Sequence, residues 1–161
     1  PKVVAQPPKA ASGRGQRQDE AAEQRRRSLL RLLQKHGVRE RPVMADGNCQ
    51  FRALADQLYG SEEHHASIRE QVVHQLQSNP DRYCGFVPGS YEAYLAEMSG
   101  DGTWGDHVTL QAAADSLGVG IHVLTDHLTD GFIEVVPQDR KSNKVLRLSF
   151  WAEVHYNSLA C

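Results

Sequence analysis

The chain has 161 residues, of which 40% are hydrophobic and 24% are charged, as is typical of a single globular domain with its own core. A formal net charge of -2 provides no strongly basic surface, so we exclude nucleic acid as a partner. No apolar run approaches the roughly 20 residues that span a bilayer, and the first residues do not resemble a secretory signal. We therefore expect no membrane partner and a cytoplasmic location, with the nucleus as a second location.

The chain contains three cysteines, Cys49, Cys84 and Cys161, an odd number without a Cys-x-x-Cys spacing. This set fits neither a disulfide framework nor a zinc ribbon, so we expect reduced thiols. His64 and His65 are adjacent near the start of a predicted helix, where neighbouring side chains point apart, which argues against their use as metal ligands. We expect no metal and no other cofactor.

Composition divides the chain into three segments. Residues 1–18 contain almost no large apolar side chain, which predicts a disordered tail. Residues 19–37 end in a leucine-rich stretch followed by Gly37, which predicts an amphipathic helix. Its leucines are expected to pack on the rest of the protein, which forms one domain over residues 38–161. A partner helix, a membrane surface, or a role in assembly or in regulating access to the domain remain alternatives for this helix.

Apolar spacing predicts four further helices in the middle of the chain. Each has a recognisable start or stop: a helix begins at Cys49, Ser61 and Asp106 are suitable N-caps, and Gly60 and Gly118 are suitable terminators. The predicted helices lie between Cys49 and Gly60, between Ser61 and Asn79, from Ser90 to Met98, and between Asp106 and Gly118.

After Gly118 the pattern changes to extended segments separated by turn-forming Asp-Gly and Ser-Asn sequences. Helices followed by consecutive strands predict an α+β fold in which a central, mostly antiparallel β-sheet is packed between helices. The predicted strands are 119–124, 132–136, 145–150 and 154–159.

The sequence Asp46-Gly47-Asn48-Cys49 places a thiol where a turn meets the first turn of a helix. The positive end of the helix dipole and the unpaired backbone N–H groups there both lower the pKa of a thiol. The same N–H groups, including that of Cys49, could hold the oxyanion that forms when a thiolate attacks a carbonyl. Gly47 would allow the backbone to approach closely.

A matching base occurs near the end of the chain. Strand alternation puts His155 and Asn157 on one face, where the Asn157 carbonyl can accept from one imidazole nitrogen and leave the other for Cys49. Cys84 has no histidine at a supporting spacing and Cys161 is the last residue, so neither replaces Cys49 as the candidate nucleophile.

Three motifs, Asp46 to Leu54, Trp104-Gly105-Asp106-His107 and His155-Tyr156-Asn157-Ser158, together resemble the signatures of the ovarian tumour (OTU) family of deubiquitinases. The resemblance covers residues 41–159. Gln50 stands where the family commonly has leucine, and the form Cys-Gln-Phe-Arg-Ala-Leu is similar to the plant otubain-like branch. The resemblance implies a papain-like fold and a thiol protease that cleaves isopeptide bonds at the C-terminus of ubiquitin.

The resemblance also implies roles for individual residues. Cys49 would be the nucleophile, His155 the general base, Asn157 the third member of the triad, and Asp46 an acid that supports the oxyanion loop. That loop would include Gly47 and Asn48. By position, Trp104 is expected to be structural, with its ring packed near the floor of the site and followed by a capped helix, and His107 is not expected to be catalytic.

Several functions are compatible with this resemblance. An OTU-like domain could hold ubiquitin without cleaving it, although the intact Cys-His-Asn set argues against this. The motifs specify acyl transfer rather than the surface that recognises the modifier, so another ubiquitin-like modifier is an alternative to ubiquitin or polyubiquitin. We expect the protein to act as a monomer.

Overall fold

The computed structural model describes residues 12–126, 129–152 and 154–161. In the described residues, no helix is long and apolar enough to cross a membrane. The helices are α1 (Ser12–Lys35), α2 (Cys49–Tyr59), α3 (His65–Ser78), α4 (Pro80–Tyr83), α5 (Tyr91–Met98) and α6 (His107–Leu117), with 3-10 turns η1 (Glu62–His64) and η2 (Cys84–Phe86). The strands are β1 (Arg39–Arg41), β2 (Gly120–Thr125), β3 (Phe132–Val135), β4 (Val145–Trp151) and β5 (His155–Ala160).

The strands form one mixed sheet in the order β1-β5-β4-β2-β3. Three of its pairs are antiparallel, and β2 runs parallel to β4. The prediction of a mostly antiparallel sheet is therefore confirmed. Because β5 lies between β1 and β4, the strand that begins at His155 is paired along both edges over part of its length.

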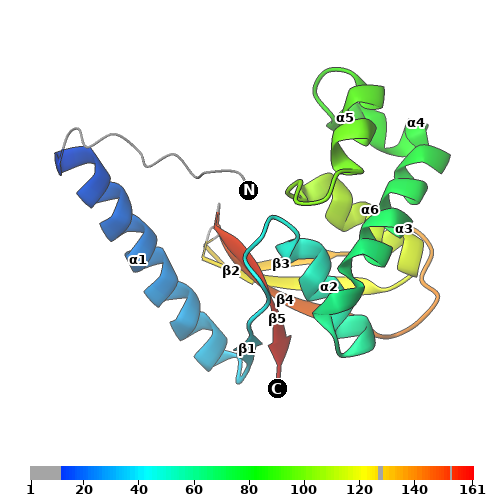
Figure 1. Cartoon of the computed structure of the whole chain (residues 1–161). Coiled ribbons are helices and arrows are strands. Elements are labelled where there is room, and N and C mark those ends of the chain that lie inside the picture. Colours follow the sequence, from blue (N-terminus) through cyan, green and yellow to red (C-terminus); the bar gives the residue numbers. More distant parts are fainter. Residues whose placement is uncertain (1–11, 127–128, 153) are drawn as a thin grey trace.

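Helices cover both faces of the sheet, with α1 on one side and the other helices on the opposite side (Figure 1). The larger core forms where α2, α3 and α6 meet the face that carries Ile121, Val123 and Leu148. On the other face, Leu29 and Leu33 of α1 are buried against Leu124 and Leu159. These contacts confirm the predicted packing of the first helix for Leu29 and Leu33, whereas Leu30 is exposed. The fold is α+β, with its sheet between helices.

Predicted caps mark several of the helix ends. Gly60 and Gly118 follow α2 and α6 with φ of 70° and 66°, the left-handed conformation that glycine adopts without strain. Asp106 begins α6 with a capping box, in which its side chain accepts from the N–H groups of Val108 and Thr109. Ser90 similarly caps α5.

The helix expected from residue 19 begins at Ser12, so residues 12–18 of the predicted tail are helical; the first eleven residues lie outside the described residues. Residues 12–18 include arginine and glutamine, which have high helix propensity. Each residue added to an existing helix gains a backbone hydrogen bond, so this extension needs no buried apolar surface. Strand β1 was not predicted because its sequence, Arg-Glu-Arg, has no apolar alternation. The short elements α4 and η2 also escaped prediction.

We predict that Asp106→Ala lowers the free energy of unfolding by about 1–2 kcal/mol, because α6 loses its capping oxygen. The Tyr94 hydroxyl, which donates to both Asp106 oxygens at 3.0 and 2.9 Å, loses its acceptor as well. Urea denaturation of the two proteins measures the difference. Asp106→Asn is the matched control, because the amide keeps one oxygen that can accept from Val108 and Thr109. Equal losses in both variants would contradict the capping explanation.

Candidate active site

Cys49 and His155 come from opposite ends of the domain and meet where the first turn of α2 lies against the start of β5. The Cys49 side chain is buried, with 6% of the residue exposed. Burial by itself would raise the pKa of its thiol, but the neighbouring His155 imidazole and the Tyr156 and Gln50 backbone favour the thiolate and bring the pKa below the ordinary value. The thiol in turn raises the pKa of His155 against the opposing effect of its own burial.

The hydrogen bonds of Asn157 determine which imidazole nitrogen faces the thiol. The Val43 N–H donates to Asn157 Oδ1 at 3.0 Å, which identifies that atom as the amide oxygen. His155 Nε2 lies 2.8 Å from the same oxygen. Because a carbonyl oxygen only accepts, Nε2 must carry the proton, and Nδ1 is left to pair with Cys49. His155 and Asn157 thus share a face of β5, as strand alternation predicts.

Asp46 holds the loop before the nucleophile. Its carboxylate accepts from the Asn48 N–H at 3.1 Å and from Arg52 Nη2 at 2.7 Å, and the Arg52 side chain is itself buried. The hydrogen bond from Arg52 is the main reason that the pKa of Asp46 lies far below its usual range. Asp46 is therefore a fixed anion that ties the loop to α2, which suits a supporting role better than proton transfer.

Asn48 fastens the same loop to the loop that follows α5. Only 2% of Asn48 is exposed. Its Oδ1 accepts from the Gly102 N–H at 2.9 Å and from Arg69 Nη2 at 2.7 Å, and its Nδ2 donates to Asp101 at 3.1 Å. Gly47 has φ of +84°, and a Cβ added there would lie 2.2 Å from the Gly102 oxygen. The backbone N–H groups at the start of α2 are consequently held in place before any substrate arrives.

Two buried polar residues that were not predicted as site residues complete this support. Arg69 donates to the carbonyls of Met98 and Thr103, and its guanidinium lies 4.2 Å from the centre of the Phe51 ring. Gln50, which is 1% exposed, accepts from the Thr109 hydroxyl at 2.7 Å. The sequence offers one weak indication that Arg69 is buried, namely its position directly after Ile68 in the apolar stripe of α3.

The structure does not support the expected packing of Trp104. Trp104 is 56% exposed, so the prediction of a ring packed near the floor of the site is wrong. The backbone on either side of it does have the structural role: the Thr103 carbonyl binds Arg69, and Gly105 lies so close to Gln50 that an added Cβ would be 2.3 Å from Oε1. These backbone contacts leave the indole directed to solvent.

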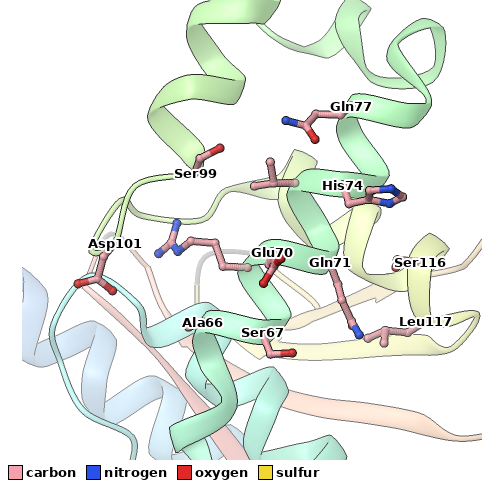
Figure 2. A pocket seen from close by; sticks show the side chains of 12 residues that line it. Ala66, Ser67, Glu70, Gln71, His74, Gln77, Ser99, Asp101, Ser116 and Leu117 are labelled. Carbon is pink, nitrogen blue, oxygen red and sulfur yellow. The ribbon is translucent and has the colours of Figure 1, made fainter.

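A cavity of about 870 Å³ lies along α3, and no triad residue lines it (Figure 2). Its lining residues come mainly from α3, with Ser99 after α5 and Ser116 near the end of α6. Arg69 and Asp101 line it and also bind Asn48, so this cavity borders the support of the loop rather than the reacting thiol. Among the residues that the structure describes, no group of three or more His, Cys, Asp and Glu residues could hold a metal ion.

A thiol, an imidazole of defined tautomer and an orienting amide make up a cysteine-nucleophile site. Residues 44–158 match the family model of the OTU-like cysteine proteases. Over 131 residues, the chain is 54% identical to "OVARIAN TUMOR DOMAIN-containing deubiquitinating enzyme 9" and 50% identical to enzyme 12 of the same series, both from Arabidopsis thaliana. The chain belongs to the family of OTU-like cysteine proteases.

These alignments cover 81% of the chain, but 38% of enzyme 9 and 60% of enzyme 12, so the chain spans less than two thirds of the length of either relative. Both of these relatives are plant enzymes, in agreement with the predicted resemblance to a plant branch of the family. Among solved structures, the OTU domain of OTUD1 has a TM-score of 0.76 at 23% identity, covering 89% of this chain and 99% of that one. An OTU domain in complex with ubiquitin has a TM-score of 0.63 at 20% identity, covering 76% and 69%. These likenesses confirm the predicted OTU fold.

We predict that Gly47→Ala destabilises the loop and slows the reaction of Cys49, because alanine at positive φ is strained and its Cβ would collide with the Gly102 carbonyl. Gly60→Ala is the matched control, since its φ is +70° and an added Cβ there meets nothing within 4 Å. Both variants should lose about 1 kcal/mol of unfolding free energy from the backbone strain, with a further loss in Gly47→Ala alone. Equal stability and equal thiol reactivity in the two variants would show that the close approach is unimportant.

We also predict that Cys49 reacts with iodoacetamide at pH values below the ordinary pKa of a thiol. The pKa of Cys49 is lowered and that of His155 is raised, because each group favours the charged form of the other. As the pH falls through the lowered thiol pKa, the rate should decline. His155→Ala should move this decline to higher pH. Peptide mapping measures the rate, with the exposed thiols of Cys84 and Cys161 as internal references; an identical profile in His155→Ala would contradict the pairing.

Proposed function

We propose that this chain is a deubiquitinating cysteine protease that hydrolyses isopeptide bonds at the C-terminus of ubiquitin, in ubiquitin conjugates or polyubiquitin. The observation that carries the proposal is the Cys49-His155-Asn157 arrangement, in which hydrogen bonds leave the basic nitrogen of the imidazole facing the thiol. Support comes from the relatives named as deubiquitinating enzymes and from the OTU domain solved in complex with ubiquitin.

In the proposed reaction, His155 Nδ1 takes the thiol proton and Cys49 Sγ attacks the carbonyl carbon of the C-terminal glycine of ubiquitin. The resulting oxyanion accepts hydrogen bonds from backbone N–H groups at the start of α2, including that of Cys49. The imidazolium then protonates the leaving lysine amine, and a thioester remains on Cys49. Water, deprotonated by His155, attacks the thioester and releases ubiquitin with a free carboxylate.

The neighbouring residues have supporting roles in this proposal. Asn157 keeps the imidazole in one tautomer without adding a full charge, while Asp46, Gly47 and Asn48 hold the oxyanion loop in a fixed shape. A preformed loop suits the reaction because donors that are already oriented need no reorganisation when charge develops on the oxygen. The exposed ring of Trp104 contributes to the surface around this support and takes no part in the chemistry.

We predict that ubiquitin with a thiol-reactive electrophile at its C-terminus forms a covalent adduct with Cys49, which intact mass and peptide mapping would detect. Cys49→Ala should form no adduct, and Cys84→Ala, which alters an exposed thiol, should react as the wild type does. A folded wild-type protein that forms no adduct with ubiquitin would refute the proposal. Parallel probes built on other ubiquitin-like modifiers would then test the same chemistry with a different substrate.

The triad members should differ in their effect on turnover of a fluorogenic ubiquitin substrate. His155→Ala should lose nearly all activity, because it removes the base. Asn157→Ala should lose about 10- to 100-fold, since the imidazole keeps its bond with Cys49 and loses only its orienting partner. Negligible loss in both variants would rule out the assigned roles.

A further inference from the structure

Strand pairing brings a partly buried carboxylate next to the third residue of the triad. Glu40 of β1 is opposite Leu159 of β5, and Ser149 of β4 is opposite Asn157 of β5. The Ser149 hydroxyl nevertheless donates to Glu40 Oε1 at 2.7 Å. Because β5 lies between β1 and β4, the Glu40 side chain must cross the face of β5 beside Asn157 to reach Ser149.

This carboxylate is anchored by α1. Arg26 donates through both terminal nitrogens to the two Glu40 oxygens, with Nη1 2.9 Å from Oε1. A bidentate arginine fixes both the position and the plane of a carboxylate. Burial would raise the pKa of Glu40, but hydrogen bonds from Arg26 and Ser149, together with the neighbouring Asn157 amide, outweigh it and keep the pKa below its ordinary value. The group at this position is therefore an ionised acceptor.

An ionised acceptor beside Asn157 selects one of the two orientations of the amide. The Nδ2 group can donate to Glu40, whereas the amide oxygen would be repelled by it. With Nδ2 turned toward Glu40, Oδ1 faces the Val43 N–H and the Nε2–H of His155, as observed. The orientation of the imidazole thus depends on a chain of contacts that begins outside the triad.

We propose that Glu40, clamped by Arg26 of α1, is a positioning residue that orients the Asn157 amide and, through it, the imidazole of His155. This inference rests on the proposed function, because the orientation of the ring matters for the transfer reaction on Cys49. It also gives α1 a part in the reaction without any contact with substrate.

A second contact of α1 reinforces the same end of the sheet. The Arg26 guanidinium lies 5.5 Å from the centre of the Trp151 ring, and Trp151 Nε1 donates to the Ala22 carbonyl at 3.2 Å. Trp151 is the register partner of His155. Helix α1 therefore contacts Trp151, which pairs with His155, and also holds Glu40, which lies beside Asn157.

The test measures kcat and KM on a ubiquitin C-terminal fluorogenic substrate. Glu40→Ala and Arg26→Gln should each lower kcat about tenfold and leave KM unchanged, since neither residue touches substrate. Glu40→Gln should retain an intermediate kcat, because its carbonyl can still accept from Asn157. Arg25→Gln is the matched control: it breaks a neighbouring ion pair from α1 to Asp126, 3.7 Å long, and should leave kcat unchanged.

A double-mutant cycle distinguishes positioning from general stabilisation. If Glu40 acts through Asn157, then Glu40→Ala should cause no further loss of kcat in an Asn157→Ala background. An additional tenfold loss in the double variant, or an unchanged kcat in Glu40→Ala alone, would overturn the proposal. Far-UV circular dichroism and urea midpoints establish that each variant is folded, with Glu40→Gln as the milder change.

Alkylation of Cys49 by iodoacetamide separates this inference from the proposed function, because it requires no ubiquitin. At neutral pH, Glu40→Ala should slow alkylation about fivefold relative to the wild type, with no change in Arg25→Gln. A wild-type protein that alkylates rapidly but cleaves no ubiquitin substrate would refute the proposed function alone. Equal alkylation rates in the wild type and Glu40→Ala would refute the positioning role alone.

Discussion

The electrostatic pairing of the Cys49 thiol with the His155 imidazole is the interaction on which the rest of the site depends. It joins the first turn of a helix to the first residue of a strand more than a hundred positions later in the chain. Neither residue is unusual by itself: a buried cysteine is common at a helix start, and a histidine at a strand end is ordinary. The reactive thiol arises because the fold places β5 against α2. Burial alone would raise the pKa of the Cys49 thiol, and His155 lowers it by favouring the thiolate.

Polar groups in the interior hold Cys49 and His155 in position, although Arg69 Nε has no hydrogen-bond partner among the described residues. The loop before Cys49 is bound from three directions: by Arg52 through Asp46, by Arg69 through Asn48, and by the close approach of Gly102 to Gly47. Buried hydrogen-bond networks of this kind contribute little net stability but specify one conformation, because each unpaired group would be costly. The shape of the site is therefore set largely by residues outside the Cys49-His155-Asn157 triad.

Local rules account for what the sequence predicts well. Helix periodicity, the Asp106 cap and the glycines after α2 and α6 locate the helices, and strand alternation places His155 with Asn157. The features that escaped prediction depend on long-range packing. Strand β1 gains its structure from pairing with β5, since its sequence has no apolar face.

The supporting residues show the same limit. In the sequence, Glu40 has the features of an exposed surface charge. Its position beside Asn157 follows only from the order of the strands in the sheet. Arg69 and Gln50 are polar residue types that are usually exposed, and only the tertiary structure supplies the partners that allow their burial. Trp104 illustrates the converse, because a large aromatic next to a predicted helix cap was expected inside and is exposed.

The pairing of β1 with β5 has a consequence for how the protein is made. Residues 39–41 can complete their edge of the sheet only after residues 158–160 have been synthesised. During translation, the helices of the middle segment can form early from local contacts, whereas the sheet closes late because its pairings are distant in sequence. Until β5 has been synthesised, a ribosome-bound chain has its thiol but not its base, and Cys49 lacks the partner that favours its charged form.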